Sequence, residues 1–430
     1  DTVKGMLSNF LSIVRRYGMI PNGGRLYYLM RSQPPLFIPM FDAYLEATGD
    51  TDFLEDSIET LEKEFDFWMK NHTVTIDKDG VNYRLAVYRD QSSGPRPESY
   101  REDVYSAQWL HSEEDRDRFY SELKTAAESG WDFSTRWFIN SNGSTVGNLT
   151  NTRIKSIVPV DLNAIIYWNA KLLSKFQRRL NNTVAADKYE SIAKEWIEAV
   201  EKVLWHDEVG SWLDYDMDNH MKRDYFYPSN LAPLWTGCYD QSRKDYYVTS
   251  ILKYLDKTNI KVNVGGIPTT LVHSGEQWDY PNAWPPLQYI VIVGLESTGD
   301  EAAKRAAYDW AEKWIRSNYE AYVSTKAMFE KYDATVIGET GGGGEYEVQL
   351  GFGWSNGVVM ELLSLFGDRL QSRAEPEEHP ANSARNSYDS LRQVVSIGIA
   401  FAGTVAAGCL GAVLCAKYQL RPKYDNIPTS

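Results

Sequence analysis

The sequence predicts an all-α protein in which helical hairpins close into a toroid, with long loops gathered at one end. Apolar residues recur at the spacing of one helix face along most of the chain. A helix, Thr-Gly-Asp, helix pattern at residues 48–50 returns at 298–300. Alternation of apolar and polar residues, which marks strands, is scarce. An open helical solenoid is the structural alternative.

Composition narrows the function classes. With 43% hydrophobic residues, the 430-residue chain can bury a large core. Its formal net charge of −14 argues against a nucleic-acid partner, which needs a basic face. The 14 Trp and 28 Tyr are many for this length, and rings in a cleft are one way to hold uncharged sugars.

The first third of the chain predicts a helix over residues 1–17 and a Gly- and Pro-bounded loop over 22–35. A helical hairpin follows, from 41–47 through the Thr-Gly-Asp turn to a second helix. The apolar stripe of that second helix is Leu54, Ile58, Leu61, Phe65 and Trp68. Residues 71–105 are polar and rich in turn formers, which indicates irregular structure.

A further helix begins at Ser112, a good N-cap, and ends at Gly130. Two more hairpins are expected, one joining residues 165–173 to a helix with an apolar stripe. The other joins 290–295 to a second striped helix. These two stripes are Ile192, Trp196, Val200 and Val203, and Ala303, Ala307, Trp310 and Trp314.

The C-terminal part changes character after the predicted domain of residues 1–367. Residues 368–393 indicate a flexible linker, and 394–416 are 23 residues without a charge, enough to cross a bilayer. The tail, 417–430, begins with basic residues that favour the cytoplasmic side, so the large domain is expected outside the plasma membrane. A buried soluble helix and a lipid-anchor signal are the alternatives to a span.

Other sequence features bear on the cellular compartment of the protein. Cys238 is the only cysteine before the apolar run, so no intrachain disulfide is expected there. No signal peptide is recognised, which predicts a mature product or a fragment. Glycosylation sequons begin at four asparagines and favour an extracytoplasmic glycoprotein. They are Asn71, Asn142, Asn148 and Asn181.

One carboxylate stands out for chemistry. Asp132 follows the helix stop at Gly130. Trp131 and Phe133 are its neighbours in the sequence, and Trp137 follows a few residues later. A carboxyl group held among rings has its charged form disfavoured, which raises the pKa and suits a general acid. The alternative is an aspartate that caps the next turn beside a core aromatic cluster.

Five loops combine Gly or Pro with aromatic and acidic residues. They are residues 22–35, 94–99, 128–137, 277–286 and 341–357. Arg31 and Arg96, in the first two, could donate to sugar hydroxyls or polarise a carboxylate, or could instead form surface ion pairs. From the residues alone, Glu345 ranks level with Glu330 as a second carboxylate, because its glycine-rich loop allows close approach to a ligand. Glu330, in a charged helix face, would then be solvated surface.

Competing chemistries are disfavoured. The six histidines lack zinc-ligand spacing, and the acidic run at 214–218 fails the calcium-loop pattern at its sixth and twelfth positions. The glycines at 341–344 lack the Lys-Ser/Thr of a phosphate-binding loop, and no G-x-S-x-G elbow occurs. We therefore predict paired carboxylates, no metal and no cofactor.

The motif QWDYPNAWPP resembles a signature of the trehalases, inverting glycoside hydrolases that cleave α,α-trehalose to two glucoses. ESGWDFSTRW, RPES, the MRSQPP loop and GGGGEYEVQLGFGWSNG resemble the same family, in the same order, over about residues 10–366. The resemblance implies an (α/α)6 barrel, a trehalose pocket without metal, and a membrane-bound animal type. It makes no prediction of oligomeric state.

The same resemblance implies roles for individual residues. Asp132 would be the general acid and Glu330, in FEKYDA, the general base, with an inverting mechanism. The residues implied to contact substrate are Asn22, Arg31, Ser32, Gln33, Arg96, Pro97, Glu98, Gly130 and Glu345.

One departure from the family pattern bears on activity. PNGGRLYY only echoes the family signature PGGRFxExYxWDxY. The chain is therefore expected to be a fragment or splice product that lacks an arginine, a Trp-Asp pair and one or two helices of the toroid. A catalytically weak or silent membrane-anchored sugar-binding protein is the alternative function, and another (α/α)6 glucosidase is a third.

Overall fold

The computed structural model describes residues 1–90, 92–344 and 347–370, which are mostly helical. The α-helices of this part are α1 (Thr2–Tyr17), α2 (Phe37–Thr48), α3 (Thr51–Asn71), α4 (Tyr100–Ser106), α5 (Glu113–Ser129), α6 (Val160–Arg179), α7 (Thr183–Leu204), α8 (Ala232–Thr236), α9 (Lys244–Lys257), α10 (Pro285–Ser297), α11 (Glu301–Thr325) and α12 (Gly353–Phe366).

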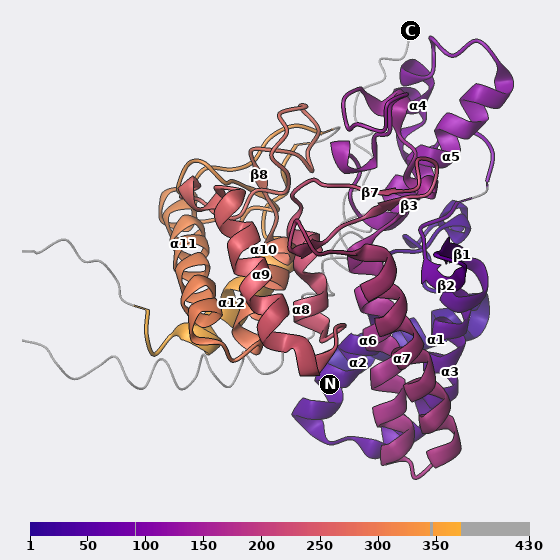
Figure 1. Cartoon of the computed structure of the whole chain (residues 1–430), viewed down its shortest axis with the longest axis vertical. Helices are drawn as coiled ribbons and strands as arrows, with labels where there is room; N and C mark the ends of the chain where they lie inside the picture. Colours follow the sequence, from indigo (N-terminus) through magenta and orange to yellow (C-terminus); the bar gives the residue numbers. More distant parts are fainter. Residues whose placement is uncertain (91, 345–346, 371–430) are drawn as a thin grey trace, which may run out of the picture.

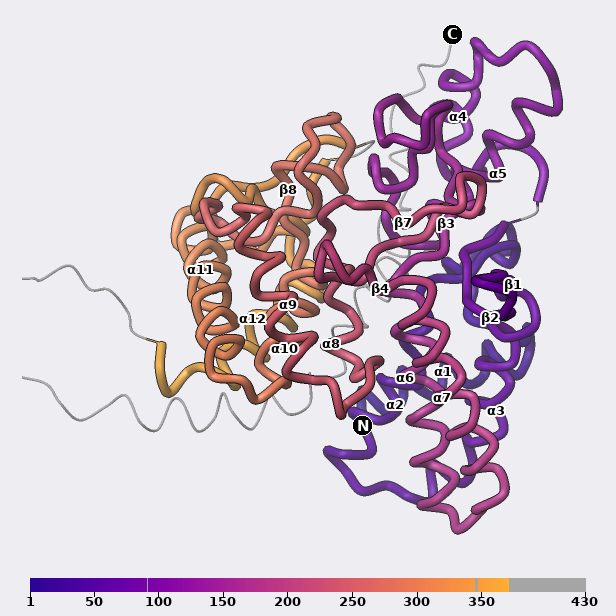
Figure 2. The backbone as a smooth tube through the Cα atoms, in the orientation of Figure 1, coloured from indigo at the N-terminus to yellow at the C-terminus, as the bar shows by residue number. Residues whose placement is uncertain are grey.

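The helices form a curved row, with α1 and α3 towards one end and α11 and α12 towards the other (Figure 1). Two helices connect the row: α6 packs against α2, α3, α7 and α8, and α10 packs against α8, α11 and α12. The backbone trace in Figure 2 shows the same order, with the long loops, α4 and α5 above the helix row. The predicted gathering of loops at one end is therefore seen.

The predicted hairpins are present, and both Thr-Gly-Asp turns work in the same way. Gly49 and Gly299 end α2 and α10 with φ of 70° and 74°, a left-handed conformation that suits glycine. Asp50 and Asp300 are the N-caps of α3 and α11; the Asp300 carboxylate accepts from the backbone N–H groups of Ala302 and Ala303 at 2.8 and 2.9 Å.

Helix α5 also begins and ends as the sequence predicts. The Ser112 hydroxyl accepts from the Asp115 backbone N–H at 2.9 Å, and Gly130 has φ of 78°. The chain therefore leaves α5 sharply and enters the segment that contains Asp132.

The expectation of irregular structure over residues 71–105 is wrong in part. β1 (Thr73–Lys78) and β2 (Val81–Ala86) form an antiparallel hairpin in that stretch. Asp79 and Gly80 make its two-residue turn with φ of 55° and 77°, and Asp-Gly is a strong hairpin signal. The remaining strands are short pairs between loops: β3 (Ile157–Val158), β4 (Trp205–His206), β5 (Ser211–Trp212), β6 (Tyr215–Asp216), β7 (Met221–Lys222), β8 (Asn282–Ala283) and β9 (Tyr332–Asp333).

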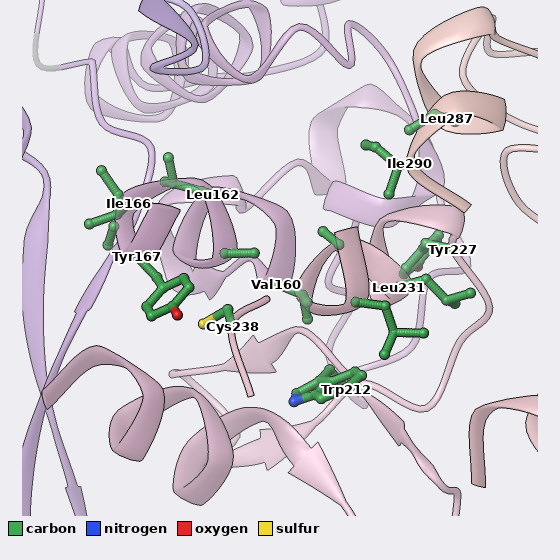
Figure 3. Close-up of a cluster of buried hydrophobic side chains, with 14 of the residues drawn as sticks. Val160, Leu162, Ile166, Tyr167, Trp212, Tyr227, Leu231, Cys238, Leu287 and Ile290 are labelled. Carbon is green, nitrogen blue, oxygen red and sulfur yellow. The ribbon is translucent and has the colours of Figure 1, made fainter. Parts of the chain in front are cut away.

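One connected hydrophobic core extends from Leu7 in α1 to Phe366 in α12. Figure 3 shows part of this core, with buried side chains of α6 such as Val160, of α10 such as Ile290 and of the short helix around Leu231. Cys238 is buried there beside Tyr167, and it is a free thiol. The chain thus forms its helix row by apolar packing.

The C-terminal predictions fall outside the described residues. These are most of the linker, the apolar run at 394–416 and the tail at 417–430. In the described part, no helix has the length and apolar character needed to cross a membrane.

Candidate active site

The segment that follows α5, residues 130–137, is here called the Asp132 loop. Asp132 itself is half-buried, and the rings of Trp131, Phe133 and Trp137 are buried around its backbone. The indole N–H of Trp137 donates to the Trp131 carbonyl at 3.0 Å, which closes the loop on itself. The loop therefore has the aromatic surroundings that the sequence predicts.

Asp279 holds the Asp132 loop from a distant part of the chain. Its buried carboxylate accepts from the Ser134 hydroxyl at 2.8 Å and from the Thr135 backbone N–H and hydroxyl at 2.9 Å each. The Ser274 hydroxyl donates to the same group. Burial raises the pKa of Asp279, and these hydrogen bonds, led by that of Ser274, oppose the rise.

Arg136 fixes the other side of the loop. Its buried guanidinium pairs with Asp161 at 2.9 Å and with Asp214 at 2.8 Å. The same group lies 4.5 Å from the ring centre of Trp131 and 4.4 Å from that of Trp137. A planar guanidinium satisfies two carboxylates and two aromatic faces at once, so the loop has little freedom.

A column of indole rings runs from the Asp132 loop towards Glu330. Trp131 stacks on Trp278 at 5.2 Å, and Trp278 stacks on Trp284 at 3.9 Å with the planes 1° apart. Trp354 meets Trp284 edge-on at 5.6 Å, and its indole N–H donates to the Glu330 carbonyl at 2.8 Å. Rigid rings therefore connect the two predicted catalytic segments.

Glu330 lies at a bend outside the helices and is only 3% exposed, so the interpretation as a solvated helix face is wrong. Its backbone N–H donates to the Gln349 carbonyl at 3.0 Å, and the Gln349 N–H donates to the Glu330 carboxylate at 3.3 Å. The next residues form β9, which pairs with β8. This pairing places the Glu330 segment against the Trp278 region.

Lys331, the residue that follows Glu330, is a buried lysine near both predicted catalytic segments. Its side chain is fully buried, and burial lowers the pKa of its ammonium group to about 8. Glu330 and, more weakly, Asp132 act against this shift electrostatically. Two carboxylates far apart in sequence therefore act on one ammonium group.

The loop that carries Asn22 and Arg31 is fastened to the end of α5. The amide groups of Asn22 and Gln33 donate to the Ala127 carbonyl at 3.3 and 3.2 Å. The Ser32 N–H donates to the Glu128 carboxylate at 2.8 Å. Gly130 lies beside Gln33, since a Cβ built on Gly130 would approach the Gln33 amide oxygen to 3.4 Å. These predicted substrate contacts thus form one cluster.

The two predicted arginines are buried, at 3% and 2% exposed, so the surface ion-pair alternative is wrong for both. Arg31 pairs with Glu98, and its buried Nε has no hydrogen-bond partner among the described residues. Arg96 pairs with Asp103 at 2.6 Å and lies 4.8 Å from the ring of Phe133 in the Asp132 loop. Pro97 and Glu98, which directly follow Arg96, are exposed.

The glycine-rich stretch packs closely against residue 277. A Cβ on Gly344 would lie 2.6 Å from the Gln277 amide oxygen, and one on Gly341 would lie 2.4 Å from that of Asn282. Only glycine permits these approaches. Glu345, the remaining predicted contact, lies outside the described residues.

A small cavity of about 40 Å³ lies beneath the Asn22 loop, lined there by Ser32 and Gln33 and from below by Glu64 of α3. This volume suits a few water molecules and is too small for a disaccharide. Among the described residues, no group of three or more His, Cys, Asp or Glu side chains could hold a metal ion.

The sequence singled out the right segments but not every residue that organises them. Arg136, Gln277 and Asp279 lie inside motifs that were recognised, yet only Gly130 and Asp132 were selected there. Lys331 and Glu128 were passed over as charged neighbours. A usable signal was the presence of polar residues inside otherwise aromatic motifs, since buried polar groups need partners.

Comparisons with known proteins identify the family of the chain. The family model described as Trehalase matches residues 1–367. The chain is 58% identical to a trehalase of Apis mellifera over 97% of its own length and 67% of that protein, and 49% identical to a trehalase of Homo sapiens over 87% and 63%. It therefore spans about two thirds of the length of these relatives.

A solved structure extends the likeness to the fold. The neutral trehalase Nth1 of Saccharomyces cerevisiae superposes with a TM-score of 0.62 at 21% identity, over 84% of this chain and 67% of the yeast protein. The helix row and its loop end are therefore trehalase-like. Together, the family match and the identity to curated relatives show that the chain belongs to the trehalase family of glycoside hydrolases.

Proposed function

We propose that this chain hydrolyses α,α-trehalose to two glucose molecules, with inversion at one anomeric carbon. Asp132 donates a proton to the bridging oxygen, and Glu330 removes a proton from the attacking water. The observation that carries the proposal is the column of packed indole rings that joins the Asp132 loop to the Glu330 segment. An inverting mechanism needs carboxyl groups about 6.5–9.5 Å apart, with room for water between them.

The surroundings of the two carboxylates differ in the sense that the mechanism requires. Asp132 follows a buried tryptophan and precedes a buried phenylalanine, which favours a protonated acid. Glu330 accepts a backbone N–H from Gln349 and has the Lys331 ammonium beside it, which favours the ionised base.

Polar groups around this pair supply the sugar contacts. Arg31 and Arg96 are held by carboxylates and directed into the loop end, where a guanidinium can donate to two hydroxyl groups. The further substrate contacts in the proposal are Asn22, Ser32, Gln33, Pro97, Glu98, Gly130 and Glu345. The helix row belongs, in this proposal, to an (α/α)6 toroid.

The location proposed for the domain is the outer face of the plasma membrane, anchored by residues 394–416. The four sequon asparagines support this orientation, because all of them are exposed and therefore accessible for glycosylation. Mass spectrometry of the protein purified from membranes tests it; glycans on these asparagines are expected, and unmodified sequons would contradict it.

The proposal is tested with Asp132→Asn and Glu330→Gln, assayed by glucose release from trehalose. Each change preserves shape and removes the proton transfer, so activity should fall by about 10²–10⁴-fold. Glu59→Gln, on the exposed side of α3, is the matched control and should leave activity unchanged.

Two outcomes would overturn the proposal. Near-normal hydrolysis by either variant would remove that residue from its role. A wild-type chain that binds trehalose without releasing glucose would instead favour a sugar-binding protein.

A further inference from the structure

Lys331 is a buried lysine whose contacts join three loops. Its ammonium group donates to the Gln277 amide oxygen at 2.9 Å and to the Gly343 carbonyl at 3.1 Å. The same group lies 5.1 Å from the ring centre of Trp284. Burying the ammonium group of a lysine costs folding stability unless other groups compensate the charge. The position of Lys331 therefore calls for an explanation.

Gln277 extends this contact to the proposed general acid. Its amide N–H donates to the Asp132 backbone carbonyl at 2.5 Å, and its side chain is 2% exposed. The amide orientation is determined, because its oxygen faces an ammonium donor and its nitrogen faces a carbonyl acceptor. A continuous chain of hydrogen bonds therefore runs from Lys331, the residue after Glu330, to Asp132.

The loops are shaped to permit this chain. Any side chain at Gly344 would collide with Gln277, and a Cβ on Gly341 would lie 3.1 Å from the Lys331 side chain. A backbone hydrogen bond, from the Trp278 N–H to the Phe133 carbonyl at 3.1 Å, links the same two segments as the Gln277 hydrogen bond. The segments that contain Asp132 and Glu330 are thus linked through Gln277 and Lys331.

We propose that Lys331 is a positioning residue for trehalose hydrolysis: through Gln277 it fixes the Asp132 loop relative to Glu330, and its positive charge favours the ionised form of Glu330. This inference rests on the proposed function. Of the described titratable groups, Glu330 and Asp132 are the ones that act on Lys331. Charge and tether are separable, because Gln277 provides the tether without a charge.

The first experiment compares Lys331→Met with Gln277→Met, using wild-type trehalose hydrolysis as the reference. Both variants lose the tether, so kcat should fall by about a hundredfold in each. Only Lys331→Met removes the cation. The acidic limb of its pH–activity profile, which reports ionisation of Glu330, should therefore move to higher pH, on the order of one unit, because Glu330 then keeps its proton longer.

Lys331→Arg retains the charge and should return the profile towards that of the wild type. A Lys331→Met enzyme with an unshifted profile, or with wild-type kcat, would overturn the proposal. A profile that moves equally in Gln277→Met would show that geometry alone is responsible, and would also overturn the part played by charge.

A second measurement does not depend on hydrolysis, so it remains decisive if the wild-type chain is inactive. The ε-carbon of Lys331 is followed by NMR in protein labelled with 13C-lysine and assigned by its loss in Lys331→Arg. Its titration midpoint should lie near 8. It should fall in Glu330→Gln and fall less in Asp132→Asn. A titration midpoint that stays the same in both variants would contradict the inference.

Discussion

Asp300 and Asp279 are the same residue type, and both accept backbone N–H groups, but they stabilise different kinds of structure. Asp300 is exposed and caps its own helix through residues two and three positions ahead. Asp279 is buried and receives the Thr135 N–H from 144 residues away. The first contact is local, whereas the second determines where a predicted catalytic loop lies.

The helix row and the loop end are stabilised by different kinds of contact. The helix row depends on apolar packing and on caps that each helix supplies for itself, so any one polar contact there is replaceable. The loop end depends on buried polar contacts such as Arg136 with Asp214, for which water cannot substitute. Substitutions at the two ends should therefore differ in size and in what they affect.

The largest effect is expected for Asp279→Asn. An amide cannot accept all of the donors from Ser134, Thr135 and Ser274, so the Asp132 loop should shift and kcat should fall by about a hundredfold. Unfolding free energy should drop by about 1–3 kcal/mol. Steady-state kinetics and urea denaturation measure the two effects. Ser274→Ala removes one donor and should lower kcat and the unfolding free energy by less. Full activity in Asp279→Asn would show that the Asp279 contacts do not position the Asp132 loop.

A smaller effect, on stability alone, is expected for Glu64, the buried carboxylate of the helix row. Burial raises its pKa to about 8 from 4.5, and the N–H of Trp68 opposes this only in part. Between these values the unfolded chain loses a proton that the folded chain keeps, so stability decreases as pH rises from about 4.5 to about 8. The slope should be about 1.4 kcal/mol per pH unit.

Glu64→Gln should abolish that slope and stabilise the fold at pH 7 by about 3 kcal/mol. Urea denaturation at several pH values between 5 and 8 checks both statements, with the exposed Glu59→Gln as control. A slope that persists in Glu64→Gln would show that another group is responsible.

The smallest effect is expected for Asp300→Ala. Loss of an exposed N-cap should lower the unfolding free energy by about 1 kcal/mol and leave trehalose hydrolysis unchanged. Thermal denaturation and the glucose assay provide the two readings. A marked loss of activity would mean that the helix row and the loop end are coupled more tightly than the contacts indicate.

Much of the helical architecture could be predicted because its signals are local. The apolar stripe from Leu54 to Trp68 lies within α3, and Gly49 and Gly299 end the preceding helices through their own backbone conformation. The β1–β2 hairpin was missed although Asp79-Gly80 marks it, because the surrounding stretch was judged by its polarity.

The site was less accessible to such reasoning. Glu330 and Lys331 are buried by segments that follow or precede them by tens of residues, so their charged neighbourhood wrongly indicated surface. Gln277 and Asp279 act on a loop about 145 residues earlier, and nothing local distinguishes them from turn formers. Resemblance supplied the role of Glu330, while only three-dimensional contacts reveal how it is held.

The central claim, inversion by Asp132 and Glu330 on trehalose, is tested most directly by the anomers first released. Both sugar units of the substrate are α-linked, so water attacking one anomeric carbon with inversion gives β-glucose, while the other unit leaves as α-glucose. Proton NMR at high enzyme concentration, before the anomers equilibrate, should therefore show equal amounts of α- and β-glucose. Initial release of α-glucose alone would establish retention and contradict the account.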